Sequence, residues 1–128
     1  MIYRRGTATV IDRITILEIK ESQIVEPAKL VNIQFELAML RQLRTEYGYG
    51  SKPLIKIEAD LKAANYLLWK VEDALREHED RADFGDSFVC LARQVYVIND
   101  RRAELKRNIN QIFNSTIIEE KSYTKYIL

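Results

Sequence analysis

A run of apolar residues between positions 57 and 75 constrains the fold of this 128-residue chain more than any other feature. Its members recur at alternating spacings of four and three residues: Ile57, Leu61, Ala64, Leu68, Val71 and Leu75. Such a repeat puts all of them on one stripe of an α-helix, as in the seam between two helices packed lengthwise. The pattern therefore predicts a long helix from Pro53 to about Asp80 with a helical partner.

The stretch from Asp86 to Asn114 supplies that partner, because it carries a second apolar stripe. The stripe consists of Phe88, Leu91, Ala92, Val95, Ile98, Leu105, Ile109 and Ile112. At a rise of about 1.5 Å per residue, each of the two helices would be roughly 42 Å long. Their matched lengths and short connection indicate an antiparallel hairpin, with Asp83 or Asp86 capping the second helix.

Two shorter helices are expected before this hairpin. The first, from Ala8 to Val25, follows a helical apolar stripe, and Thr7 or Thr9 could cap it. The second, from Ala28 to Tyr47, has a wide apolar face, which is typical of a helix packed on two neighbours. We therefore expect a pair of antiparallel helices on each side of the central loop.

These elements predict an all-α fold, an antiparallel helical bundle of two hairpins in which the second, residues 53–114, is the longer. A single domain should span residues 1–128. Roughly two to three turns of the longer hairpin would extend beyond the shorter one, and a homodimer could cover their apolar residues. The tail from Ile117 to Leu128 carries Tyr123, Tyr126, Ile127 and Leu128, and we expect it to fold back onto the bundle or onto a partner.

Composition excludes several classes of function. The 20 basic and 19 acidic residues give a net charge of +1, which does not favour nucleic acid or an acidic membrane as partner. No apolar run approaches the roughly 18 residues of a membrane span, so we expect no membrane span and a cytoplasmic location. Cys90 is the one cysteine and His78 the one histidine, so no metal or other cofactor is expected. We expect Cys90 to be buried or half-buried and His78 to lie at the surface.

A polar block, Asn99 to Arg102, interrupts the apolar stripe of the last long helix near its middle. Arg102 and Lys106 are four residues apart and share a helix face, which would suit a phosphate or a carboxylate. A solvated charged face is the alternative interpretation. Asn65 lies at about the same level of the preceding helix and could form a buried polar layer with Arg102, a device that fixes register.

The first predicted helix could meet this block. If Thr15 and Glu18 turned inward, they would approach the arginines of the last helix. A carboxylate beside a guanidinium group is more often a structural ion pair than a general base. We therefore assign no catalytic residue.

Three stretches, DRITILEIK (12–20), NDRRAELKRNIN (99–110) and EEKSY (119–123), resemble a family of small all-helical bacterial proteins of uncharacterised activity. They are also similar to segments attached to glycosyltransferase or lipopolysaccharide-synthesis proteins. The resemblance implies shared polar residues within these motifs. With Arg102, the candidate ligand-binding residues are Asp12, Arg13, Glu18, Lys20, Asn99, Asp100, Arg101, Arg102 and Lys106.

Two functions remain open. The first is a non-catalytic helical interaction module that self-associates as a homodimer and has a protein partner in surface-polysaccharide synthesis. The alternative is binding or turnover of a small anionic metabolite, a sugar phosphate or a nucleotide. That site would lie between the first and fourth helices, with Glu18 opposite the arginines.

Overall fold

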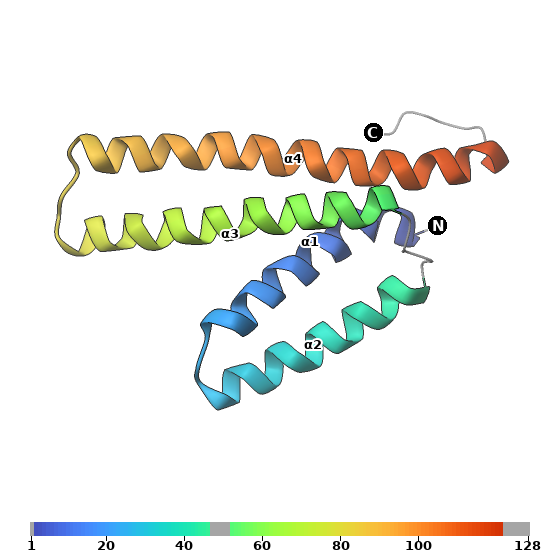
Figure 1. Ribbon diagram of the computed structural model, residues 1–128, viewed down its shortest axis with the longest axis horizontal. Helices are drawn as coiled ribbons and strands as arrows, with labels where there is room; N and C mark the ends of the chain where they lie inside the picture. Colours follow the sequence, from blue (N-terminus) through green and yellow to red (C-terminus); the bar gives the residue numbers. More distant parts are fainter. Residues whose placement is uncertain (1, 47–51, 122–128) are drawn as a thin grey trace.

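The computed structural model describes the backbone of residues 2–46 and 52–121 and the side chains of residues 7–46 and 52–113. Four helices account for most of these ranges: α1 (Ile2–Gln23), α2 (Pro27–Glu46), α3 (Lys52–Asp80) and α4 (Asp86–Lys121). Consecutive helices run antiparallel as α1–α2 and α3–α4, and the second hairpin is the longer (Figure 1). The predicted all-α bundle is therefore confirmed. Residues 117–121 of the predicted tail continue α4 and do not fold back, and residues 122–128 lie outside the described residues.

Two helix boundaries differ from the sequence prediction. α1 begins at Ile2, so Thr7 is not a cap but an interior residue, 2% exposed, whose hydroxyl donates to Asn110 Oδ1 at 3.3 Å. Packing of this turn against α4 outweighs the weak capping pattern. α4 continues past Asn114 to Lys121, and its 36 residues exceed the 29 of α3. The predicted match in length is therefore wrong.

The turn between α3 and α4 explains how the hairpin reverses. The Asp83 N–H donates to the His78 carbonyl at 2.9 Å, and the Ala82 N–H donates to the Glu79 carbonyl at 3.0 Å. With Ala82 at a φ of 53°, these bonds form a Schellman motif that ends α3. Asp83 Oδ1 accepts from the Gly85 N–H at 3.3 Å, within the turn. Asp86 is already the first helical residue, so neither aspartate is the predicted cap of α4.

Two residues near this turn depart from their predicted exposure. His78 is 9% exposed, with Nδ1 3.0 Å from the Asp83 carbonyl and its ring 6.1 Å from the ring of Phe88. It is therefore part of the hairpin end and not a surface residue. Cys90 is exposed rather than buried, because it points away from the stripe that faces α3.

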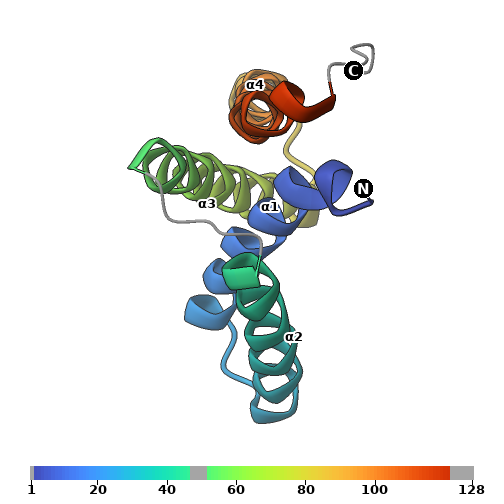
Figure 2. The same cartoon turned by 90° about the vertical axis from the view of Figure 1, so that its right-hand side faces the viewer.

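α1 is the central helix of the fold. It contacts α2, α3 and α4, and Figure 2 shows α4 and α2 on opposite sides of it. One apolar cluster joins α1 to α3 and α4, and a second joins α1 to α2. The two clusters include Ile11, Leu61 and Ile109 in the first and Ile14, Leu17 and Leu37 in the second. Polar residues of α1 that face α3 and α4 are consequently buried as well.

α2 packs on α1 alone through its buried face, which corrects the prediction of two neighbours. An ion pair between Arg44 and Glu58 also links it to α3. The residues that widen its apolar face remain in solvent: Val31 is 64%, Phe35 69% and Met39 52% exposed. The apolar face of α2 is thus wider than the part of it that is buried against α1.

None of the described helices combines the length and the apolar character needed to cross a membrane.

Candidate functional site

A buried polar cluster lies where α1 crosses α3. Asn65 Nδ2 donates to Asp12 Oδ1 at 2.8 Å and to Thr15 Oγ1 at 2.7 Å. The Thr15 hydroxyl in turn donates to the Asp12 backbone carbonyl at 2.8 Å. Asp12, Thr15 and Asn65 are 7%, 0% and 6% exposed. Their spacing of three residues on α1 puts Asp12 and Thr15 on one face, where both meet Asn65.

Arg102 of α4 completes this cluster from the other side. Its Nη2 lies 2.6 Å from Asp12 Oδ2, and the two side chains are 20% and 10% exposed. A second terminal nitrogen, Nη1, donates to Asn99 Oδ1 at 3.4 Å. Lys106 Nζ lies 3.7 Å from the same Asp12 oxygen. The predicted layer of Asn65 and Arg102 therefore forms, with Asp12 as the group that links them.

The guanidinium of Arg102 is not fully bonded. Its Nε is buried and has no hydrogen-bond partner among the described residues. Leaving such a donor unpaired costs about 1–3 kcal/mol. This atom is one of the groups that an incoming acceptor could satisfy.

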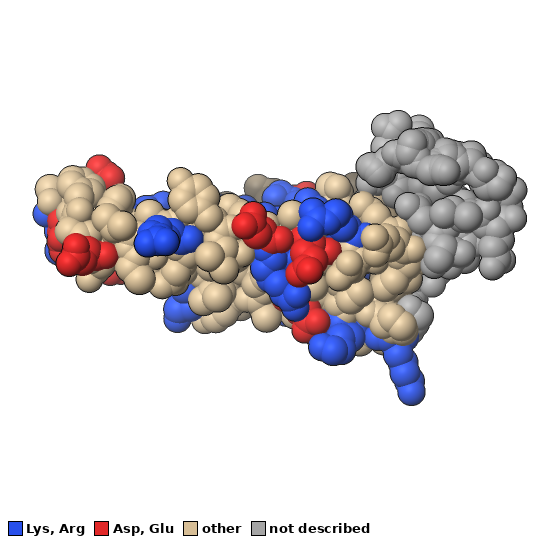
Figure 3. Space-filling view, turned by 90° about the horizontal axis from the view of Figure 1, so that it is seen from above, with Lys and Arg blue, Asp and Glu red and all other residues tan. Residues whose placement is uncertain are grey.

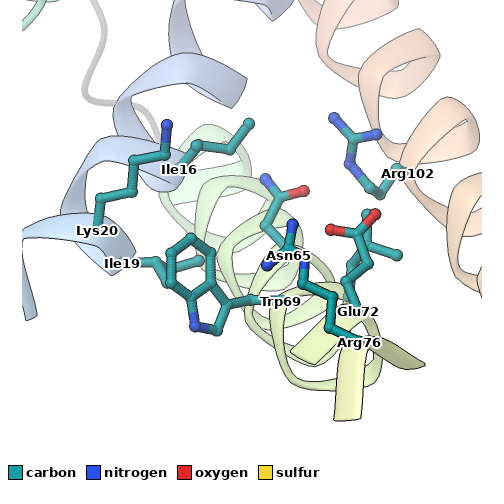
Figure 4. Close-up of a pocket in the computed structure, with 9 residues that line it drawn as sticks. Ile16, Ile19, Lys20, Asn65, Trp69, Glu72, Arg76 and Arg102 are labelled. Carbon is teal, nitrogen blue, oxygen red and sulfur yellow. The ribbon is translucent and has the colours of Figure 1, made fainter. Parts of the chain in front are cut away.

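A pocket of about 300 Å³ opens beside this cluster, between α1, α3 and α4. Figure 4 shows side chains from all three helices around it. Its lining consists of Ile16, Ile19, Lys20, Asn65, Leu68, Trp69, Glu72, Arg76 and Arg102. Three basic side chains and one carboxylate line the pocket, and two of the three also have an acidic partner outside the lining, Asp12 for Arg102 and Asp73 for Arg76.

Glu18 is held away from this pocket. Its carboxylate lies 2.9 Å from Arg41 Nη2 and 3.1 Å from Lys62 Nζ, on α2 and α3. Burial would raise the pKa of Glu18, but the hydrogen bonds from Arg41 and Lys62 outweigh it and hold the pKa below its ordinary value. The structure therefore does not bring Glu18 opposite the arginines of α4.

Arg13 also forms a structural ion pair, with α2. Its Nε and Nη2 lie 2.9 and 3.0 Å from the two carboxylate oxygens of Glu36. This bidentate bond raises the pKa of Arg13 and lowers that of Glu36. The pair fixes α1 to α2 at their surface, since the side chains are 42% and 41% exposed.

The remaining candidates divide between the pocket and solvent. Lys20 lines the pocket, whereas Asp100 and Arg101 are exposed on α4. Arg101 pairs with Glu104 at 3.2 Å, one turn away on the same helix. The polar block at 99–102 is thus split: Arg102 faces the cluster, whereas Asn99, Asp100 and Arg101 are exposed, and Asn99 accepts a hydrogen bond from Arg102.

Besides Asn65 and Leu68, three pocket residues on α3 were not among the predicted site residues: Trp69, Glu72 and Arg76. They follow Asn65 at spacings of four, three and four, which places them on one helix stripe next to the apolar seam. That spacing could have identified them. No group of three or more His, Cys, Asp or Glu within the described part of the chain is arranged to hold a metal ion.

Comparison with known proteins gave one family. The model of a family of unknown function, DUF6165, matches residues 1–128. Searches of curated proteins and of solved structures found no match.

Proposed function

The chain belongs to this family of unknown function, DUF6165, and we propose that it is a non-catalytic helical interaction module that self-associates through the end of its long hairpin. The observation that carries the proposal is the incomplete burial of that end. Leu61 and Ile109, near α1, are 0% exposed. The seam residues Leu75 and Val95, farther along the hairpin, are only half-buried.

Exposed apolar residues lie on the outer face of α4 over the same stretch, interspersed with Arg93 and Gln94. Val89, Tyr96 and Val97 are 50%, 72% and 68% exposed. Val89 and Val97 flank a shallow depression that Arg93 also lines. In Figure 3, the end of the long hairpin lies at the left, and most of its visible surface is formed by residues that are neither basic nor acidic. Exposed apolar residues spaced for helix packing are typical of an interface.

A second copy of the chain is the occupant we propose for this face. Residues 72–86 hold seven acidic residues and two arginines, whereas residues 101–107 hold four basic residues and one glutamate. Arg101, Arg102 and Lys106 have acidic partners within the chain, which leaves Arg107 as the exposed basic residue without an ion pair among the described residues. In an antiparallel pair of hairpins, the acidic end of one copy would lie toward the basic stretch of the other. A two-fold axis would repeat that attraction and would form a four-helix bundle.

The setting we propose is the cytoplasm, with a protein partner in surface-polysaccharide synthesis. It is supported by the resemblance of the three motifs to segments attached to glycosyltransferase and lipopolysaccharide-synthesis proteins. Removing the gene from its host should deplete or shorten the surface polysaccharide, measured by gel electrophoresis of the extracted material. An unchanged polysaccharide profile would exclude this setting.

Sedimentation velocity over a range of concentrations tests self-association. We expect a dimer at tens of micromolar, in the range of transient interfaces. The double variant Val89→Glu, Val97→Glu should be monomeric, because it puts four carboxylates across a symmetric apolar contact. Phe35→Glu on α2 is the control, since it changes an equally exposed apolar residue on another face.

Two outcomes count against the proposal. A wild-type chain that is monomeric at the highest concentration would contradict self-association. Dissociation by Phe35→Glu but not by the α4 double variant would assign the interface to α2 instead. Circular dichroism of each variant checks that its helices are intact.

A further inference from the structure

We propose that the pocket between α1, α3 and α4 binds a monosaccharide phosphate. The phosphate would lie among Lys20, Arg76 and Arg102, and the sugar ring would lie against Trp69. This inference does not depend on self-association, because the pocket is formed by one copy of the chain. Figure 4 shows the labelled side chains around the cavity.

The cations of the pocket are available to a ligand to different degrees. Lys20 has no ion pair within 4.0 Å among the described residues, and its charge helps to lower the pKa of Glu36 on α2. Arg76 is bound only loosely, with Nη1 3.5 Å from Asp73 and its side chain 76% exposed. Both can turn toward a phosphate at little cost, because Lys20 breaks no ion pair and Arg76 gives up only a long, solvent-exposed contact with Asp73.

Arg102 contributes a fixed donor group. The 2.6 Å contact with Asp12 holds its guanidinium in place. Its Nε is buried without a hydrogen-bond partner among the described residues. A ligand oxygen at this wall would supply that partner, and the side chain would lose little conformational freedom on binding.

The other polar groups select for a sugar. Trp69 is half-buried and presents an indole ring to the cavity, a surface on which the C–H face of a sugar ring can lie. Glu72 is exposed at the rim and has no ion pair in the described part of the chain. A carboxylate accepts hydrogen bonds from sugar hydroxyls but repels a second anionic group. This arrangement favours a sugar phosphate over a dicarboxylate.

The size of the pocket narrows the ligand further. Its volume of about 300 Å³ is at the lower end of the range for small-molecule sites, about 300–1,000 Å³. A monosaccharide phosphate fits that volume, whereas a nucleotide would extend into solvent. The pocket therefore favours the first of the two metabolite classes that the sequence left open.

Fluorescence of Trp69 gives a direct test, because it is the one tryptophan of the chain. Titration with glucose 6-phosphate should produce a saturable change. Lys20→Gln and Arg76→Gln should each weaken binding about tenfold, the usual effect of losing one charged hydrogen bond. Lys70→Gln is the matched control, since Lys70 is an exposed residue of α3 outside the pocket lining. It should bind like the wild type.

Glucose and inorganic phosphate serve as separate probes of the two halves of the ligand. Each should bind at least tenfold more weakly than glucose 6-phosphate. The absence of a saturable change up to about 10 mM glucose 6-phosphate would overturn the proposal. Equal binding of inorganic phosphate would overturn the sugar assignment, and equal weakening by Lys70→Gln would show general surface attraction instead of this site.

Discussion

Replacement of Asp12 by alanine should destabilise the fold far more than loss of an ordinary ion pair. Asp12 accepts hydrogen bonds from Asn65 at 2.8 Å and from Arg102 at 2.6 Å. Lys106 Nζ is a further 3.7 Å neighbour. One carboxylate therefore links α1 to both helices of the long hairpin.

The magnitude follows from burial. The Asp12 and Arg102 side chains are 10% and 20% exposed, so Asp12→Ala leaves a largely buried guanidinium without its counter-charge. Breaking a buried pair from one side costs about 3–5 kcal/mol. Because water can still reach part of Arg102, we expect the lower end, about 3 kcal/mol. Asp12→Asn keeps the shape of the side chain and one of its two acceptor oxygens, and should lower the free energy of unfolding by about half as much.

Glu36→Ala is the matched control. Glu36 binds Arg13 through two hydrogen bonds of 2.9 and 3.0 Å, so the geometry of that pair is at least as good. Its side chains are 42% and 41% exposed, and solvent screens such pairs to about 0.2–1 kcal/mol. The comparison therefore separates a buried carboxylate that links three helices from an exposed one with a single partner.

Urea denaturation followed by circular dichroism measures both effects. With an m-value of about 2 kcal/mol/M, Asp12→Ala should lower the midpoint by about 1.5 M and Glu36→Ala by less than about 0.5 M. All variants are compared at one protein concentration, because self-association would add to the stability. Equal costs for the two variants would refute the argument that burial sets the strength of the Asp12 cluster.

Three further outcomes are expected. The lowered pKa of Glu18 stabilises the fold above its unfolded pKa near 4.5, and this stability is lost as the pH falls through the folded pKa. Glu18→Gln should therefore make Tm fall less steeply with pH below about 4.5. An unchanged dependence of Tm on pH would contradict this role of Glu18. Ala82→Gly should raise Tm by about 2–5 °C, because Ala82 has a left-handed φ of 53°, which is unfavourable for a residue with a Cβ atom but not for glycine. A lower Tm would show that Ala82 is not strained. Leu61→Ala replaces a residue that is 0% exposed and should lower the free energy of unfolding, measured by urea denaturation, by about 3 kcal/mol. Leu67→Ala replaces a residue that is 51% exposed and should lower it by less than about 1 kcal/mol. Similar losses for the two variants would argue against the assigned seam.

The fold was predictable because apolar spacing is a local property. The seam from Ile57 to Leu75 faces α4 and α1 in the structure, and it predicted α3 almost to its ends. Capping was less predictable. Thr7 is a good cap by residue type, but packing against α4 extends α1 past it. A cap contributes only about 1 kcal/mol, so tertiary contacts can override it.

The candidate site was predictable in part. Asn65 and Arg102 were identified as polar residues at one level of two adjacent helices, and the structure joins them through Asp12. Glu18 was expected on the same side, but it pairs with Arg41 and Lys62. The rotation of α1 about its axis decides which of its polar residues meets α4. Sequence periodicity does not fix that rotation when apolar residues are spread around most of the helix.

Apolar spacing, prolines and glycines act within single helices and their connections, so the four helices of the described residues, their pairing into hairpins and the level of the polar block were predictable. The packing of the folded chain determined that α2 has one helical neighbour and that Phe35 stays exposed. It also decided that Lys20, Trp69 and Arg76 would share a pocket with Arg102. Those outcomes depend on how α1 crosses the long hairpin, and a crossing is set by the side chains of several helices at once.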